Sequence, residues 1–107
     1  MTDKDNLDRL FRVVIRDRDK VCQICGARYN LQVAHNINRR YLQTRWEMDN
    51  ACLLCFYCHS KIDNSKTIKV EFFKRRIGDT RFNGLLELSR DKSKIDYEKI
   101  KLNLKGV

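Results

Sequence analysis

The sequence predicts a small α+β domain with strands and tight turns in the middle and helices at both ends. Apolar residues recur at helical spacing near the two ends, whereas the middle holds short extended stretches and two Cys-x-x-Cys turns. A chain of 107 residues accommodates one domain with a modest hydrophobic core. We therefore expect a single domain over 1–107, divided into an N-terminal helix (1–20), a cysteine-rich core (21–64) and a helical C-terminal extension (65–107).

The first helix is expected over residues 3–17. One face of this segment is apolar at the spacing i, i+3, i+4, i+7 and i+8, and it consists of Leu7, Leu10, Phe11, Val14 and Ile15. Arginines occupy the other faces, at Arg9, Arg12 and Arg16. Asp3 or Asp5 can cap the start of this helix.

The middle of the chain alternates between turns and strands. Cys22-Gln-Ile-Cys25-Gly26 predicts a tight turn, and Leu31-Gln-Val-Ala-His35 predicts a strand. Residues 37–50 show no period, so we expect a long loop; a structureless loop of that length in a small domain is usually functional. Asn50-Ala-Cys-Leu-Leu-Cys55 then predicts a second strand, which leads into another turn and a helix at Cys58-His59.

Three further helices are expected after this core. The first covers about 67–77 and ends at Gly78, and the second covers about 80–90. The last begins near Ser93, whose pairing with Asp96 resembles a capping box.

Charge and hydropathy narrow the classes of function. Lys and Arg number 23 against 14 Asp and Glu, which gives a net charge of +9 and favours a polyanionic partner. No apolar run reaches the length of a membrane span, and the start, MTDKDNLDRL, is too polar for a signal peptide. We therefore expect a cytoplasmic protein without a membrane partner, whose five cysteines serve metal binding rather than disulfides.

The cysteines form two Cys-x-x-Cys pairs, which predict a structural zinc site. Tetrahedral zinc takes four thiolates, and such a turn presents two sulfurs to one ion. The preferred ligands are Cys22, Cys25, Cys55 and Cys58, which leaves Cys52 as a buried thiol on the strand. Two alternatives remain: Cys52 pairs with Cys55 and Cys58 is free, or all five cysteines are buried free thiols.

The two histidines lie beside this cysteine framework. His35 ends the first strand, and His59 follows Cys58 at the start of a helix, where Asp63 shares its face four residues later. The simpler interpretations are that His59 is a fourth zinc ligand and that His35 is a hydrogen-bonded core residue.

The combined order resembles the HNH (ββα-metal) endonuclease family over residues 22–63. Paired cysteine turns enclose a histidine, a basic loop and a central asparagine, and the motif closes with Cys-His-x-Lys. The residues that carry this similarity are Ala34-His35-Asn36, Asn50 with Cys55, and Cys58-His59-Ser-Lys61. A looser similarity, to NinG-type phage recombination nucleases, rests on Gln32-Val-Ala-His35, Thr44-Arg-Trp46, Asp49-Asn50, the Cys55/Cys58 turn and a helical tail with Gly78.

The resemblance implies a zinc-stapled ββα-metal core that hydrolyses DNA phosphodiesters with one divalent cation, Mg²⁺ or Mn²⁺. His35 would be the general base, Asn50 would orient its imidazole by a hydrogen bond, and His59 would ligate the cation. Many family members place Asp or His where this chain has Ala34. The ion would then be hydrated and held mainly by His59, or also by Asp63, unless Asp63 is an ordinary solvated carboxylate.

DNA is the partner that the resemblance and the charge imply. Arg39, Arg40 and Arg45 in the loop and Lys61 in the following helix are the expected phosphate contacts. Trp46 either stacks on a base or packs in the core. The protein is therefore expected to be a phage or prophage nuclease that nicks or cuts duplex or branched DNA. It would act in the bacterial host cytoplasm as a monomer or a homodimer. The alternatives are a zinc-stabilised DNA-binding module with weak or no catalysis and, less economically, a thiol redox protein.

Overall fold

A computed structural model describes residues 2–106, so the ends of the predicted domain, Met1 and Val107, lie outside the described residues. The described chain contains six α-helices and a two-stranded sheet, which confirms the α+β class. None of these helices combines the length and apolar character needed to cross a membrane. The elements follow one another as α1 (Asp3–Asp19), β1 (Leu31–His35), α2 (Leu42–Arg45), the 3-10 turn η1 (Met48–Asn50), β2 (Ala51–Cys55), α3 (Phe56–Asp63), α4 (Lys66–Ile77), α5 (Asp79–Ser89) and α6 (Tyr97–Lys105).

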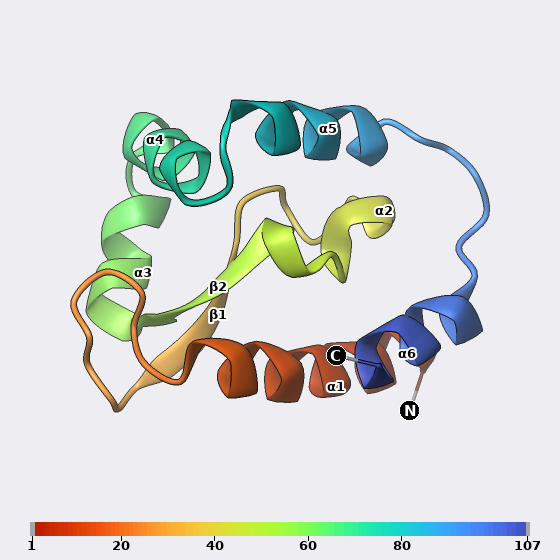
Figure 1. Cartoon of the computed structure of the whole chain (residues 1–107), viewed down its shortest axis with the longest axis horizontal. Helices are drawn as coiled ribbons and strands as arrows, with labels where there is room; N and C mark the ends of the chain where they lie inside the picture. The colour runs from red at the N-terminus through yellow and green to blue at the C-terminus, as the bar shows by residue number, and fades with distance from the viewer. Residues whose placement is uncertain (1, 107) are drawn as a thin grey trace.

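The two strands form an antiparallel pair at the centre of the molecule. Leu31 lies opposite Cys55 and His35 opposite Ala51. α3 begins at the residue after β2, and the Cys55 sulfur caps it by accepting a hydrogen bond from the Cys58 amide at 3.4 Å. Figure 1 shows the strand pair between α1 along one edge of the molecule and the α4–α5 pair along the opposite edge.

Alternation along β2 creates two hydrophobic cores, one on each face of the sheet. The core toward α3, α4 and α5 contains Cys22, Ala34, Cys52, Leu54, Cys55, Cys58, Ile62, Phe73 and Phe82. The core toward α1 and α6 contains Leu7, Phe11, Ile15, Trp46, Ala51, Leu53 and Leu104. All five residues of β2 are therefore buried, and Trp46 is a packing residue with 5% exposure.

α1 is longer and capped differently than its apolar period predicts. Thr2, rather than Asp3 or Asp5, is the N-cap, and its hydroxyl accepts from the Asp5 amide at 3.1 Å in a capping box. The extra C-terminal residues bind η1 and β2: Arg18 donates to the Met48 and Ala51 carbonyls at 2.8 Å each, and Asp19 accepts from the Leu53 amide at 2.9 Å. These contacts hold α1 against β2.

The predicted loop over 37–50 is partly ordered into α2 and η1, which is the main correction to the expected elements. α4 and α5 lie within two residues of their expected bounds, with Gly78 between them at a φ of 85°. α6 begins later than predicted, because Asp96 rather than Ser93 caps it by accepting from the Lys99 amide at 3.1 Å. Ser93 instead donates its backbone N–H to Asp91 at 2.8 Å.

Candidate metal centre and histidine cleft

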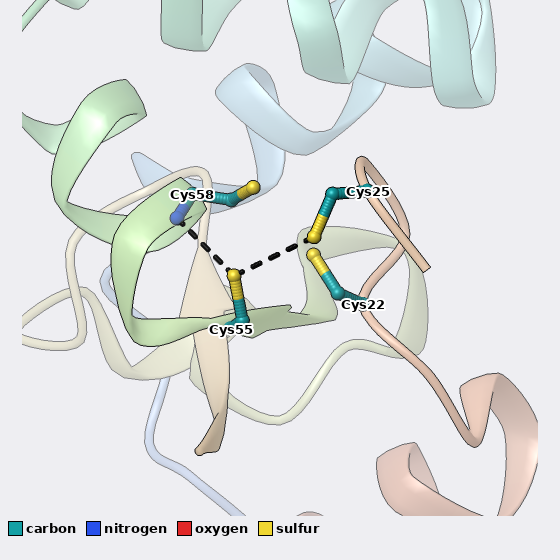
Figure 2. Close-up of side chains that lie close together, drawn as sticks. All are labelled: Cys22, Cys25, Cys55 and Cys58. Atoms are coloured by element: carbon teal, nitrogen blue, oxygen red, sulfur yellow. Dashed lines mark hydrogen bonds between the residues drawn. The ribbon is translucent and has the colours of Figure 1, made fainter. Parts of the chain in front are cut away.

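Four cysteines converge where the turn after α1 meets the junction of β2 and α3 (Figure 2). Their sulfur atoms all lie within 4.8 Å of one another, and the Cys25 and Cys55 sulfurs are 3.7 Å apart. A tetrahedral zinc ion with bonds of about 2.3 Å requires sulfur–sulfur separations of roughly 3.8 Å. The four side chains, Cys22, Cys25, Cys55 and Cys58, could therefore hold one structural metal ion such as zinc.

Local backbone geometry presents each pair of sulfurs. In the first turn the Gly26 amide donates to the Cys22 carbonyl and the Cys22 amide to the Ala27 carbonyl, both at 2.9 Å. Gly26 has a φ of 79°, a left-handed conformation that glycine adopts without a steric penalty. The Gln23 amide also donates to the Leu53 carbonyl at 2.9 Å, which fixes the turn against β2.

The surroundings of the clustered thiols shift their pKa values in different directions. Burial raises the pKa of Cys22, but nearby backbone N–H groups outweigh it and lower the pKa to about 6. Burial and the neighbouring thiols hold the pKa of Cys58 well above its usual range. A bound Zn²⁺ would keep all four sulfurs as thiolates. The donor set therefore fits zinc, which would supply structural stabilisation without an open position for catalysis.

Cys52 lies outside this cluster, as the preferred pairing predicts. Its side chain is fully buried in the core toward α4, and burial raises its pKa to about 12. The alternative pair Cys52/Cys55 is therefore not the one assembled in the structure.

His35 is held at the end of β1 by packing and by one backbone hydrogen bond. Its ring lies 5.7 Å from the Phe11 ring, and Nε2 lies 2.9 Å from the Arg45 carbonyl oxygen. A carbonyl only accepts, so Nε2 carries the proton and Nδ1 is left as an acceptor. Burial lowers the pKa of His35 to about 4, more than the Arg45 carbonyl raises it. The imidazole is consequently neutral near pH 7.

Asn50 positions this histidine indirectly, which corrects the expected hydrogen bond to the imidazole. Its side chain is fully buried; Oδ1 accepts from the Ile37 amide at 2.9 Å, and Nδ2 donates to the carbonyls of Ile37 and Thr44 at 3.2 and 3.0 Å. Both amide protons are thus used by the loop backbone. Asn50 fixes the loop that carries Arg45, and the Arg45 carbonyl in turn holds His35.

We expect Asn50→Ala to lower the free energy of unfolding by about 2–4 kcal/mol, because it leaves buried backbone groups of Ile37 and Thr44 unpaired. Urea denaturation measures the change. Asn38→Ala is the matched control, since the exposed Asn38 makes one local bond to the Arg40 amide at 2.9 Å. Equal destabilisation by both substitutions would contradict the role assigned to Asn50.

A cleft of about 220 Å³ opens between α1 and β1, with His35 in its wall. Its lining residues are Asp8, Phe11, Arg12, Arg16, Leu31, Gln32, Val33, His35 and Arg39. Three arginines therefore share the lining of the cleft with His35, and Arg16 also donates to the Leu31 carbonyl at 3.0 Å. Arg12 and Arg16 were not predicted as site residues, although their i, i+4 spacing beside the apolar face of α1 was visible in the sequence.

The loop arginines differ in how exposed their guanidinium groups are and in whether these groups are already bound within the chain. Asp8 accepts hydrogen bonds from Arg39 at 2.6 Å, from Arg45 at 2.5 and 3.1 Å and from the Trp46 indole at 2.9 Å. Burial opposes ionisation of Asp8, but these donors outweigh it and lower its pKa. Arg45 is only 15% exposed and acts as an anchor, whereas Arg39 is 54% exposed. The other two predicted contacts, Arg40 and Lys61, are exposed; Arg40 lies over the ring of its neighbour Tyr41.

His59 and Asp63 meet on α3, as their spacing predicts. His59 Nε2 lies 3.1 Å from Asp63 Oδ2, and Nδ1 lies 2.7 Å from Gln32 Oε1. Gln32 also lines the cleft, but it lies opposite Leu54 on the face of the sheet toward α3, whereas His35 lies opposite Ala51 on the face toward α1. Over residues 2–106 the cysteine cluster is the one group of three or more His, Cys, Asp or Glu side chains arranged for a metal. Ala34 is fully buried in the α3–α5 core and adds no ligand.

The lowered pKa of His35 predicts acid sensitivity. Below pH 6.5 the unfolded chain takes up a proton at His35 that the folded chain refuses until about pH 4, so stability falls across this window by roughly 3 kcal/mol. Denaturation at pH 7, 6, 5 and 4 measures it against His35→Gln, which lacks this titration. Loss of metal at low pH affects both proteins, so the difference between them isolates His35. A constant difference across the series would contradict the prediction.

Comparisons with known proteins give no match: no family model, no curated protein and no solved structure matches the chain. The resemblance to HNH nucleases accordingly rests on its motifs.

Proposed function

We propose that this chain is a metal-dependent DNA endonuclease of the HNH kind, which nicks or cleaves duplex or branched DNA. The observation that carries the proposal is a neutral imidazole, with Nδ1 free to accept a proton, in a cleft bordered by Arg12, Arg16 and Arg39. A phosphodiester is the anion that such a cleft suits, because guanidinium groups pair with phosphate oxygens.

His35 would act as the general base. Its Nδ1 accepts a proton from water, the water oxygen forms a bond to phosphorus, and the bond from phosphorus to the leaving 3′ oxygen breaks. A phosphate in the cleft favours the imidazolium and so raises the pKa of His35 from about 4 toward the range useful for catalysis. His59 and Asp63 would hold a divalent cation such as Mg²⁺ or Mn²⁺, which supplies charge stabilisation at the phosphate.

A second candidate function is a zinc-stabilised DNA-binding module without catalysis. The small number of ligands for a catalytic cation favours this candidate. His59 and Asp63 have no third protein ligand among the described residues, and Ala34 lies in a core. Both candidates use the same arginine-bordered cleft, so DNA binding alone does not separate them.

Cleavage of supercoiled plasmid and of a synthetic four-way junction tests the nuclease proposal. The wild-type protein is expected to nick at least one substrate when Mg²⁺ or Mn²⁺ is added, and not when divalent cations are omitted. Omission is preferable to a chelator, because a chelator also removes zinc from the cysteine cluster. A zinc-loaded protein that binds DNA but cleaves neither substrate with any cation would favour the binding module instead.

Arg12→Gln tests the cleft itself. One lost phosphate contact is expected to weaken duplex binding and to reduce the slope of log affinity against log salt by about 1. Fluorescence anisotropy at several salt concentrations measures both quantities. The control is Arg90→Gln, which removes an exposed positive charge at the end of α5, away from the cleft. The same slope change in both variants would show that Arg12 acts only through net charge.

A further inference from the structure

We propose that an exposed aromatic platform beside the cysteine cluster binds the unpaired bases of a DNA strand. The platform consists of Tyr29, Phe56 and Tyr57, three residues that are 74%, 62% and 74% exposed. This inference rests on the proposed function for its choice of DNA as the partner, and it adds a second contact surface that the motifs do not indicate.

The three rings emerge at one end of the strand pair. The Phe56 amide donates to the Asn30 carbonyl at 2.9 Å, one step beyond the pairing of Leu31 with Cys55. Tyr29 precedes that bond on one segment, and Tyr57 follows it on the other. Figure 1 shows the start of β1 and the start of α3 at this same end of the hairpin.

The rings have no packing role in the folded chain. Over residues 2–106 the ring–ring and cation–ring contacts involve other aromatic residues, and both cores exclude all three side chains. Single exposed apolar residues are ordinary, but three large rings gathered at one end of a small domain indicate a binding surface.

Charge around the platform favours a nucleic acid over a protein. Arg28 and Lys61 flank it, both exposed and neither with a charged partner in the described chain. Lys61 follows Tyr57 by four residues on α3 and therefore lies near it on the helix surface. The two segments that build this end, 20–35 and 51–62, contain no Asp or Glu, and the acidic residues that adjoin them are paired: Asp19 with Arg18 and Arg76, and Asp63 with His59 and Lys69.

Single-stranded nucleic acids are bound by this combination of side chains, because bases stack on aromatic rings while basic groups contact the backbone. Four thiolates around Zn²⁺ would leave a net negative charge beside the platform. That charge disfavours phosphates directly over the cysteine turn and leaves Arg28 and Lys61 as their contacts. Unpaired bases, whose faces are uncharged, therefore suit the rings themselves.

The test is the affinity of the zinc-loaded full chain for a fluorescein-labelled 15-mer of thymidine and for a duplex of equal length, without divalent cations so that no cleavage occurs. Tyr29→Ala and Tyr57→Ala are each expected to weaken single-strand binding by about 5- to 100-fold and to leave duplex affinity within about twofold. Tyr57→Phe retains a ring and should bind as wild type does. Leu102→Ala, which removes a side chain that is 68% exposed on α6, is the matched control.

A second measurement uses an oligonucleotide that carries 5-iododeoxyuridine, whose photo-crosslinks are expected on peptides that contain Tyr29, Phe56 or Tyr57. Unchanged single-strand affinity in both tyrosine variants overturns the platform, as does a finding by sedimentation that these substitutions abolish self-association instead. The experiments distinguish failure of the platform proposal from failure of the nuclease proposal. A wild-type protein that does not cleave DNA but loses single-strand affinity in Tyr57→Ala keeps the platform and loses the nuclease.

Discussion

Removal of the metal from the cysteine cluster is expected to unfold the protein, and substitution of the exposed ligand Cys25 should have the same effect. Structural zinc in small domains contributes on the order of 10 kcal/mol, which is comparable to the whole stability of a domain of this size. Here the metal would join the turn after α1 to the junction of β2 and α3. Without it, the turn is held to β2 by the hydrogen bond from the Gln23 amide to the Leu53 carbonyl and by the packing of Cys22 in the core.

Cys25→Ser is the most informative substitution, because Cys25 is exposed while the other three clustered cysteines are buried. In a metal-free protein, replacement of an exposed sulfur by oxygen changes stability little. In a zinc protein it removes a ligand, so zinc content and the thermal midpoint should both fall. Ile24→Ser in the same turn, at a side chain that is 46% exposed, is the control and should melt with the wild type.

Zinc content by mass spectrometry, thermal unfolding by circular dichroism and the thiolate-to-metal absorption of a Co²⁺-substituted sample give three independent readings. One metal per chain in the wild type, together with its loss in Cys25→Ser, is the expected result. A Cys25→Ser protein that melts with the wild type would rule out a structural metal at this cluster.

Replacement of His35 is expected to lower DNA cleavage by about 10²- to 10⁴-fold and to leave DNA affinity nearly unchanged, because a general base contributes to that extent and the proposed phosphate contacts are arginines. His35→Gln preserves most of the side-chain volume against Phe11 and can donate to the Arg45 carbonyl, so it keeps the fold while removing the base. His35→Ala leaves space beside the cleft.

Rescue of the His35→Ala variant by added imidazole is a more specific test of the same prediction. It should restore part of the cleavage rate in His35→Ala, and not in His35→Gln, where the side chain occupies the site. The rate of the wild type should also fall on acidification, as His35 becomes protonated. Cleavage by His35→Ala at the wild-type rate would remove His35 from the mechanism and would direct attention to His59 and Asp63.

Much of the fold follows from local pattern. The helical period and Gly78 place α4 and α5, the alternation around Leu31–His35 places β1, and the two Cys-x-x-Cys turns identify the four clustered cysteines. These features depend on neighbours within about four residues or on a motif with its own geometry. The same holds for His59 and Asp63, which one turn of α3 brings together.

The cleft depends instead on contacts between distant segments, which no local pattern specifies. The sequence predicts Arg45 as a phosphate contact, yet its side chain is held by Asp8, 37 residues away. The sequence predicts Asn50 as a hydrogen-bond partner of the His35 imidazole, yet it binds the backbone of Ile37, 13 residues away. Arg12 lines the cleft only because α1 packs along β1.

Local sequence pattern was therefore sufficient for the class of fold, for the cysteine cluster and for the pairing of His59 with Asp63 on one helix face. Contacts between distant segments set which arginine side chains are exposed, which carbonyl holds His35 and which side chains line its cleft. Helix period, turn geometry and ligand spacing are properties of short segments. Hydrogen bonds of a buried carboxylate or amide are instead set by whichever donors the packing of α1, the loop and the hairpin brings within reach.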